Sequence, residues 1–175
     1  MTFSALREAV PVVLVSTGTA AEVSARLAQA APLLARQLGL VCLSPLELAL
    51  APDQALAALE QQAAGSALTW LGVDPGLALA DGRPWAQALG AWRQPTLLLL
   101  EAAQLDTGTA AATTALLREQ GAPLLGLIQW GEPWQPERRR LEGLPWLGAL
   151  GPSGEIEGVD LRAALALQLQ GAAAG

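Results

Sequence analysis

Short apolar runs alternate along the chain with longer, alanine-rich stretches in which apolar residues recur every three or four positions. Runs that are apolar throughout and rich in branched residues are typical of strands buried on both faces of a parallel sheet. Their alternation with helices predicts an α/β fold of three layers, a mostly parallel sheet flanked by helices. The predicted strands are Val10–Val15, Leu40–Leu43, Ala67–Leu71, Thr96–Leu100, Leu124–Ile128 and, as a last edge strand, Pro145–Leu150.

Capping signals place the ends of several helices. Thr19 and Glu22 form a capping-box pattern, and Gly39 ends the helix that follows. The run Ser44-Pro45-Leu46-Glu47 repeats the start signal, and helical sequence interrupted near Pro52 is expected after it. The predicted helices cover residues 19–38, 44–64 with that interruption, 84–92, 106–120, a short turn carrying Arg138–Arg140, and a C-terminal stretch capped by Asp160. We expect one domain over residues 1–170, a loop over residues 151–158 and a disordered tail over residues 171–175.

Four residue types are missing, and their absence excludes whole classes of chemistry. The 175 residues include no histidine, lysine, tyrosine or asparagine, and all ten basic residues are arginines. The chain therefore has no catalytic triad with histidine, no histidine-ligated metal, no Schiff-base lysine and no phosphate-loop lysine. The single cysteine, Cys42, forms neither an internal disulfide nor a cysteine-based zinc site, and we expect it to be buried.

The charge balance limits the partners. A net charge of −6 argues against nonspecific nucleic-acid binding, which depends on neutralising phosphates. The basic run Arg138–Arg140 is interpreted as a solvated helix turn rather than an anion site. No apolar stretch is long enough to span a membrane, and Ala9–Val15 is better explained as a buried strand than as a signal peptide. We therefore expect a cytoplasmic protein with no membrane or nucleic-acid partner.

The segment Ser16–Ala25 lies between the first buried strand and a capped helix, where nucleotide-binding α/β proteins carry their phosphate loop. Here the chain resembles dethiobiotin synthetase, of the deviant P-loop ATPases and amidoligases, whose pattern is a strand, T-G-T-D-T-G-V-G-K-T, a helix ending at glycine and a strand ending in K-P. The spacing holds from Val15 through Gly39 to Ser44-Pro45. The resemblance returns at residues 68–100, 102–130 and 144–148, and is absent around residues 47–66. It implies a P-loop-type fold.

The residues that perform the family's chemistry are replaced. The loop keeps Thr17, Gly18 and Thr19, but Ser24 stands at the position of the phosphate-binding lysine and Ala25 at that of the magnesium-binding threonine. Each such electrostatic contact contributes roughly 3 kcal/mol to transition-state stabilisation in phosphoryl transfer. Three further positions of a vestigial pocket, where the family has a substrate-binding lysine, an acidic residue and an adenine-reading asparagine, are here Ser44, Trp70 and Trp130. Glycine positions of the loop are filled by Ala21 and Val23, and Glu22 adds a negative charge that repels phosphate.

Four carboxylates are the remaining candidates for chemistry. Asp74, Asp81 and Asp106 follow the third and fourth strands, at the edge of the sheet where ligands bind in open α/β proteins. They are interpreted mainly as turn and cap residues, with a shared metal site as the alternative, and we predict no metal. Glu101 directly follows an apolar strand, where a strand-end residue facing water competes with a catalytic carboxylate.

Six tryptophans beside one phenylalanine are unusual. Trp70 and Trp130, with Trp146 near them, fall where the family keeps polar ligand-binding groups, so they either fill the vacated pocket or form a partner surface. Trp134, in a proline-containing loop that we expect to be exposed, is the best candidate for a partner contact. Trp85 and Trp92, seven residues apart, are expected to share one buried helix face.

Together these observations predict a catalytically degenerate relative of dethiobiotin synthetase, a pseudoenzyme without a cofactor that acts through protein contacts. The resemblance implies a homodimer, or a heterodimer with an active relative. Two alternatives stay open. One is an ATP-dependent ligase of altered active site in biotin biosynthesis, using Glu101, Asp74 or Asp106. The other is a small-molecule binding module with a tryptophan-lined pocket.

Overall fold

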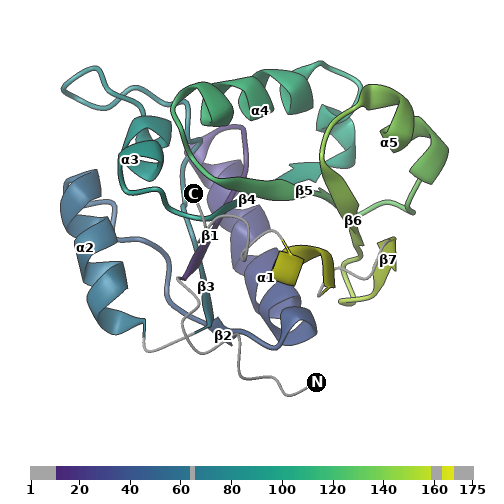
Figure 1. The fold of residues 1–175 in the computed structure, drawn as a ribbon, viewed down its shortest axis with the longest axis horizontal. Coiled ribbons are helices and arrows are strands. Elements are labelled where there is room, and N and C mark those ends of the chain that lie inside the picture. Colours follow the sequence, from purple (N-terminus) through teal and green to yellow (C-terminus); the bar gives the residue numbers. More distant parts are fainter. Residues whose placement is uncertain (1–10, 64–65, 159–162, 168–175) are drawn as a thin grey trace.

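A seven-stranded sheet forms the centre of the computed structural model, which describes residues 11–63, 66–158 and 163–167 (Figure 1). The spatial order is β2-β3-β1-β4-β5-β6-β7; the first six strands of this order pair in parallel, and β7 pairs antiparallel with β6. The strands are β1 (Val12–Val15), β2 (Val41–Cys42), β3 (Ala67–Trp70), β4 (Thr96–Glu101), β5 (Leu124–Trp130), β6 (Trp146–Leu150) and β7 (Ile156–Gly158).

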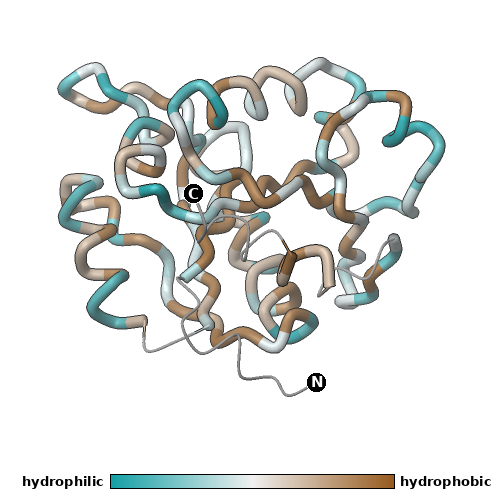
Figure 2. Tube along the Cα trace, viewed as in Figure 1, coloured by the Kyte–Doolittle hydropathy of each residue, from teal (hydrophilic) through white to brown (hydrophobic). Residues whose placement is uncertain are grey.

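Helices cover both faces of this sheet. Because successive side chains of a strand point to opposite faces, Val12 and Leu14 pack in the core against α1, whereas Val13 and Val15 pack in the core against α2, α3 and α4. Figure 2 shows the central strands as the most hydrophobic part of the chain. The helices are α1 (Ala20–Leu38), α2 (Pro52–Gln62), α3 (Trp85–Ala91), α4 (Thr109–Glu119) and α5 (Pro136–Glu142), with a 3₁₀ turn η2 (Ala102–Gln104) and helical residues 163–167.

The predicted α/β class with a mostly parallel, helix-flanked sheet is confirmed. The ends of α1 also agree with the prediction: Thr19 is the N-cap of a complete capping box, and Gly39 ends the helix with a φ of 69°. The strand at residues 40–43 is shorter than predicted. β2 is a two-residue outer strand, so Val41 is 64% exposed and Cys42 is exposed rather than buried. Partial burial still raises the pKa of the Cys42 thiol.

The helix start predicted at Ser44-Pro45-Leu46-Glu47 is wrong. This segment is not helical. It runs alongside β3 and is hydrogen-bonded to it. The Leu46 N–H donates to the Trp70 carbonyl at 2.9 Å, and the Thr69 hydroxyl donates to the Ser44 carbonyl at 2.7 Å. With Leu46 also buried at 6% exposure, these bonds outweigh the local start signal, and the helix begins only at Pro52.

The strand predicted over residues 145–150 is present as β6, but its predicted edge position is wrong, because residues 156–158 of the predicted loop add β7 beyond it. Gly148 pairs with Gly158 at this junction. A Cβ on Gly148 would lie 2.4 Å from the Glu157 carbonyl oxygen, and one on Gly158 would lie 2.7 Å from the Gly148 Cα. The two strands therefore meet this closely because neither residue carries a side chain.

Several predicted positions lie outside the described residues: the start of the first strand at Val10, the end of the second helix at Ala64, the cap at Asp160 and the tail over residues 171–175. None of the described helices combines the length and apolar character that crossing a membrane requires.

Candidate functional site

The carboxyl ends of β3, β1 and β4 define the candidate site. The chain leaves β1 towards the face covered by α1, and it leaves β3 and β4 towards the face covered by α3 and α4. Adjacent strands that exit to opposite faces create the crevice in which open α/β sheets bind ligands. The loop after β1 (Ser16–Thr19) and the segments after β3 and β4 surround this point.

The chain's own carboxylates bind the backbone amides of the β1–α1 loop. The Gly18 N–H donates to Asp74 Oδ2 at 3.1 Å, and the Thr19 N–H donates to Glu22 Oε2 at 2.9 Å. Gly18 has a φ of 128°, and a Cβ there would lie 3.1 Å from Glu22 Oε2, so the glutamate closes over the loop. Two N–H groups of the loop are therefore already bonded to anions.

Glu22 is ionised more readily than an ordinary glutamate. The Thr19 hydroxyl donates to Glu22 Oε2 at 2.7 Å, and this bond, the bond from the Thr19 N–H and the charge of Arg26 hold the pKa of Glu22 below its usual range. A carboxylate in the first turn of a helix is also stabilised by the helix dipole. The negative charge at the mouth of the loop is thus a stable property of the fold.

The second half of the segment Ser16–Ala25 is helical. α1 begins at Ala20, so Ser24 and Ala25 lie inside its second turn, and the Val23 N–H already donates to the Thr19 carbonyl at 2.9 Å. Ser24 is half-buried and Ala25 is exposed. A phosphate loop needs consecutive N–H groups that are free to converge on the ligand. From Val23 onward these groups are committed to helical hydrogen bonds.

Arg26 fixes the loop from behind and was missed by our sequence reasoning. Its Nη1 donates to Ser16 Oγ at 2.8 Å and to the Thr17 carbonyl at 3.0 Å, and its Nη2 forms an ion pair with Glu101 Oε2 at 2.7 Å. The Arg26 side chain is 8% exposed, whereas that of Glu101 is 49% exposed. The sequence does contain a signal for this role. Arg26 lies between Val23 and Ala30 on the apolar face of the predicted helix, and a buried arginine needs a charged or polar partner.

Gln104 in η2 completes this network. Its Nε2 donates to the Thr17 carbonyl at 2.7 Å and to the Thr17 hydroxyl at 2.8 Å.

Glu101 is neither a strand-end residue facing only water nor a carboxylate free for catalysis, because its Oε2 binds Arg26. The loop after β1 and the loop after β4 are joined into one rigid unit.

The three aspartates proposed as a shared metal site have separate partners. Asp74 accepts the N–H groups of Gly18 and Gly76, Asp81 binds Arg83, and Asp106 pairs with Arg138. Across residues 11–63, 66–158 and 163–167, no three histidine, cysteine, aspartate or glutamate side chains are grouped so as to hold a metal ion. Asp74 and Asp81 accept backbone N–H groups of their own turns, as the turn interpretation expects, whereas Asp106 pairs with Arg138.

Both pocket tryptophans pack on the α1 face of the sheet, Trp130 inside the core and Trp70 at its margin. Trp70 is half-buried beside the loop: a Cβ on Gly72 would lie 3.6 Å from the Trp70 ring, 3.7 Å from Leu48 and 3.7 Å from Ser24 Oγ. Trp130 ends β5, is only 7% exposed and belongs to the core on the α1 face. Since β1 and β4 separate β3 from β5, the two rings pack at different places along this core. Ser44 is exposed, with its carbonyl bonded to Thr69.

Trp134 and Trp146 form a second cluster with a buried arginine. Their rings meet edge to face at 6.4 Å, and Arg139 lies over the Trp146 ring at 5.1 Å. Arg139 is 3% exposed, donates to Gln129 Oε1 at 3.2 Å and pairs with Glu142, so the prediction of a wholly solvated arginine run is wrong at this position. Trp134 is half-buried rather than exposed.

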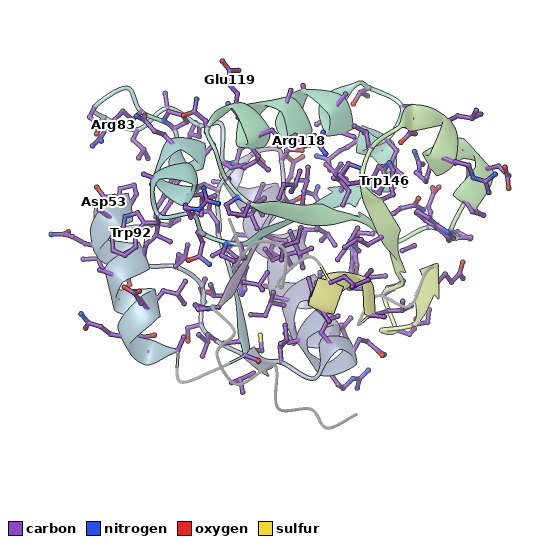
Figure 3. The ribbon with its side chains drawn as sticks, in the orientation of Figure 1. Asp53, Arg83, Trp92, Arg118, Glu119 and Trp146 are labelled. Atoms are coloured by element: carbon purple, nitrogen blue, oxygen red, sulfur yellow. The ribbon has the colours of Figure 1, made fainter. Side chains whose placement is uncertain are left out.

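The expectation for α3 also needs correction. Trp85 is buried, but Trp92 is 37% exposed, and its Nε1 donates to Asp53 Oδ1 at 2.8 Å (Figure 3). Trp92 is the C-cap of α3, where the chain turns away through Arg93, which has a φ of 47°. The heptad spacing of the two rings therefore does not place them on one buried face.

No protein-family model and no curated protein matches this chain.

Proposed function

We propose that the protein is a non-catalytic relative of the dethiobiotin synthetase type of P-loop protein, and that it acts through contacts with other proteins. The observation that carries the proposal is the state of the β1–α1 loop. Its segment matches the family's phosphate loop in position, yet the helix starts at Ala20 and carboxylates from Asp74 and Glu22 occupy the loop amides.

The charges around the loop support the same conclusion. Arg26 contacts the loop, but it donates to Thr17 and Ser16 and is paired with Glu101 behind the loop. Catalysis of phosphoryl transfer depends on cations that stabilise the equatorial oxygens of the transferred group. With Asp74 and Glu22 at the mouth, the electrostatic field at this site opposes a nucleotide.

A contact role fits the surface near the loop. Leu48 is 47% exposed and lies close to Trp70 and Ser24. Apolar side chains of this size are favoured at protein interfaces when they gather on one surface. Following the resemblance, the partner is a second copy of the chain or an active relative.

Calorimetry with ATP and Mg²⁺ tests the non-catalytic part. We expect no saturable heat up to about 1 mM nucleotide and no release of phosphate, with an active dethiobiotin synthetase as the positive control. The double variant E22Q/D74N separates the two features that exclude phosphate, the carboxylates on the loop amides and the helical start of α1. If the helical start of α1 is sufficient to exclude phosphate, this variant also fails to bind. Micromolar binding or hydrolysis by the unmodified protein would reject the proposal.

Light scattering after size exclusion tests the contact part. The chain has a mass of 18.0 kDa, so a homodimer elutes at twice that mass. A mixture with the dethiobiotin synthetase of the same organism should otherwise give a complex containing both chains. A monomer at every concentration, combined with no complex in the mixture, would reject this partner assignment.

A further inference from the structure

A cleft lies between the start of α2, the turn over residues 79–84 and the outer side of α3. It belongs to the face of the sheet covered by α2 and α3, opposite α1. Its volume is about 180 Å³. Figure 3 shows Asp53 and Trp92 side by side at this end of α2, with Arg83 on the neighbouring turn.

The walls of the cleft are small, apolar and fixed by the backbone. They include Pro52, Leu79, Pro84 and Ala88. Two of these are prolines, whose φ is locked, and the turn is closed by hydrogen bonds from the Leu79 N–H to the Arg83 carbonyl at 3.0 Å and from the Gly82 N–H to the Leu79 carbonyl at 2.8 Å. A site with preformed walls loses little conformational entropy on binding.

The polar groups of the cleft carry a net negative charge. Its charged lining residues are the carboxylates of Asp53 and Asp81 and the guanidinium of Arg83, and Gln87 adds a neutral amide. Hydrogen bonds from the Arg83 N–H and guanidinium hold the pKa of Asp81 below its usual range. Asp53 Oδ1 accepts from Trp92, and within the described part of the chain no hydrogen bond reaches Asp53 Oδ2.

The chain itself shows which group these carboxylates select. Arg83 binds Asp81 Oδ2 through both Nε and Nη2, each at 2.8 Å, while its own side chain is 60% exposed. An exposed pair of this kind contributes only about 0–1 kcal/mol, so an incoming guanidinium displaces it easily. An anion would instead face Asp53 and Asp81.

We propose that this cleft binds the side chain of an arginine presented by a partner protein. Arginine combines an apolar stem, which suits the proline and alanine walls, with a planar head that pairs with carboxylates. A volume of about 180 Å³ suits one long side chain and is smaller than the roughly 300–1,000 Å³ of most small-molecule sites.

The surroundings favour a protein over a free small molecule. Leu50, 39% exposed, precedes the lining residue Ala51, and Leu77, 52% exposed, precedes the turn. Together with Trp92 they supply large apolar side chains near the cleft, which a protein surface would cover. The inference goes beyond the proposed function and does not rest on the state of the β1–α1 loop, because the cleft lies on the other face of the sheet.

Amide NMR of the ¹⁵N-labelled protein tests this. The probes are two acetylated and amidated pentapeptides, Ala-Leu-Arg-Leu-Ala and the same sequence with neutral citrulline in place of arginine. We expect the arginine peptide to produce saturable shifts in the indole N–H of Trp92 and in the backbone amides of Asp53 and Gln87. The citrulline peptide, which has the same shape without the charge, should bind about three-fold or more weakly.

Two variants localise the effect. Asp53→Asn removes one carboxylate charge from the cleft and should weaken the arginine peptide about three-fold, whereas Glu60→Gln, an exposed residue further along α2, should leave its affinity unchanged. Retention of the other indole signals shows that each variant is folded. Equal binding of the two peptides, shifts confined to other surfaces, or no saturable shift below about 10 mM would each overturn the proposal. Nucleotide binding is measured separately, so failure here leaves the proposed function standing.

Discussion

Two buried arginines secure loops at the carboxyl ends of two strands, and they do so with different kinds of partner. Arg26 holds the loop after β1 through groups as far away in sequence as Glu101, and its Nε finds no hydrogen-bond partner among the described residues. Arg139 is held locally by Gln129, Glu142 and the ring of Trp146. Gln129 in turn donates to the carbonyls of Glu132 and Pro133, so this cluster fixes the loop after β5.

The exposure of the carboxylate partner distinguishes the two clusters. Glu101 is 49% exposed, whereas Glu142 is 24% exposed. A carboxylate that reaches water regains hydration when its partner is removed, but a buried one is left with an uncompensated charge. The comparison therefore predicts that the local cluster around Arg139 contributes more to stability than the long-range one around Arg26.

The largest effect is expected for Arg139→Met. It leaves Gln129 Oε1 without the Arg139 donor, takes the ion-pair partner from Glu142, which keeps the bond from Trp146 Nε1, and removes the cation from the Trp146 ring. The free energy of unfolding should therefore fall by about 3 kcal/mol. Urea unfolding followed by tryptophan fluorescence measures this. The neighbouring Arg140→Met, at an exposed side chain, should change stability by less than about 0.5 kcal/mol. Equal losses in both variants would contradict the assignment.

Arg26→Met should have an intermediate effect, a loss of about 2 kcal/mol in the free energy of unfolding. Ser16 Oγ keeps its bond to the Leu99 carbonyl, and the Thr17 carbonyl keeps its bond from Gln104. Glu101→Gln removes only the exposed charge and should lower stability by less than about 1 kcal/mol. If Arg26→Met proves more damaging than Arg139→Met in the same urea titration, partner exposure does not rank the two clusters.

A third arginine sharpens the comparison, because backbone strain rather than burial distinguishes it. Arg93 is the one non-glycine residue of the described ranges with a positive φ, 47°. Arg93→Gly relieves that strain, although glycine also loses more conformational entropy on folding. The net result should be a rise of roughly 0.5 kcal/mol in the free energy of unfolding. Arg93→Ala keeps the strain and serves as the control. Stabilisation by alanine as large as by glycine would point to the side chain instead.

The smallest effect is expected on the stability at low pH, and it comes from Glu22 in the first turn of α1. The folded pKa of Glu22 is below its ordinary value of 4.5, so its ionised form stabilises the fold above that value, and this contribution is lost as the pH falls through the folded pKa. Glu22→Gln should flatten this part of the acid limb of a stability-against-pH curve measured by urea titration. An unchanged slope below about pH 5 would show that the bonds from Thr19 do not matter to folding.

The sequence was most informative where local and long-range forces agree. The strands from Val12, Ala67, Thr96 and Leu124 are apolar runs that end up in the sheet, and the box of Thr19 and Glu22 starts α1 as expected. It failed at Ser44, where the same kind of start signal competes with hydrogen bonds to β3. Those bonds come from residues 24 and 25 positions away, which local patterns do not contain.

The candidate site was located but its internal contacts were not predicted. Gly18, Thr19, Glu22 and Asp74 do come together, yet the donation from Gly18 to Asp74 spans 56 residues and depends on the exact turn after β3. Arg26 and Arg139 were missed as buried anchors because charge alone predicts exposure. Trp134 was predicted to be exposed but is half-buried, and Trp92 was predicted to be buried but is 37% exposed. Position in a loop or a helix says little about which ring packs against a neighbour.

The sheet ends on both sides in very short strands, β2 with two residues and β7 with three. Such margins give an approaching polypeptide few main-chain groups to bond, which protects against stacking of molecules edge to edge. A partner would then meet side chains on helices and turns rather than a strand edge, and an assembly formed in this way would separate without unfolding its members.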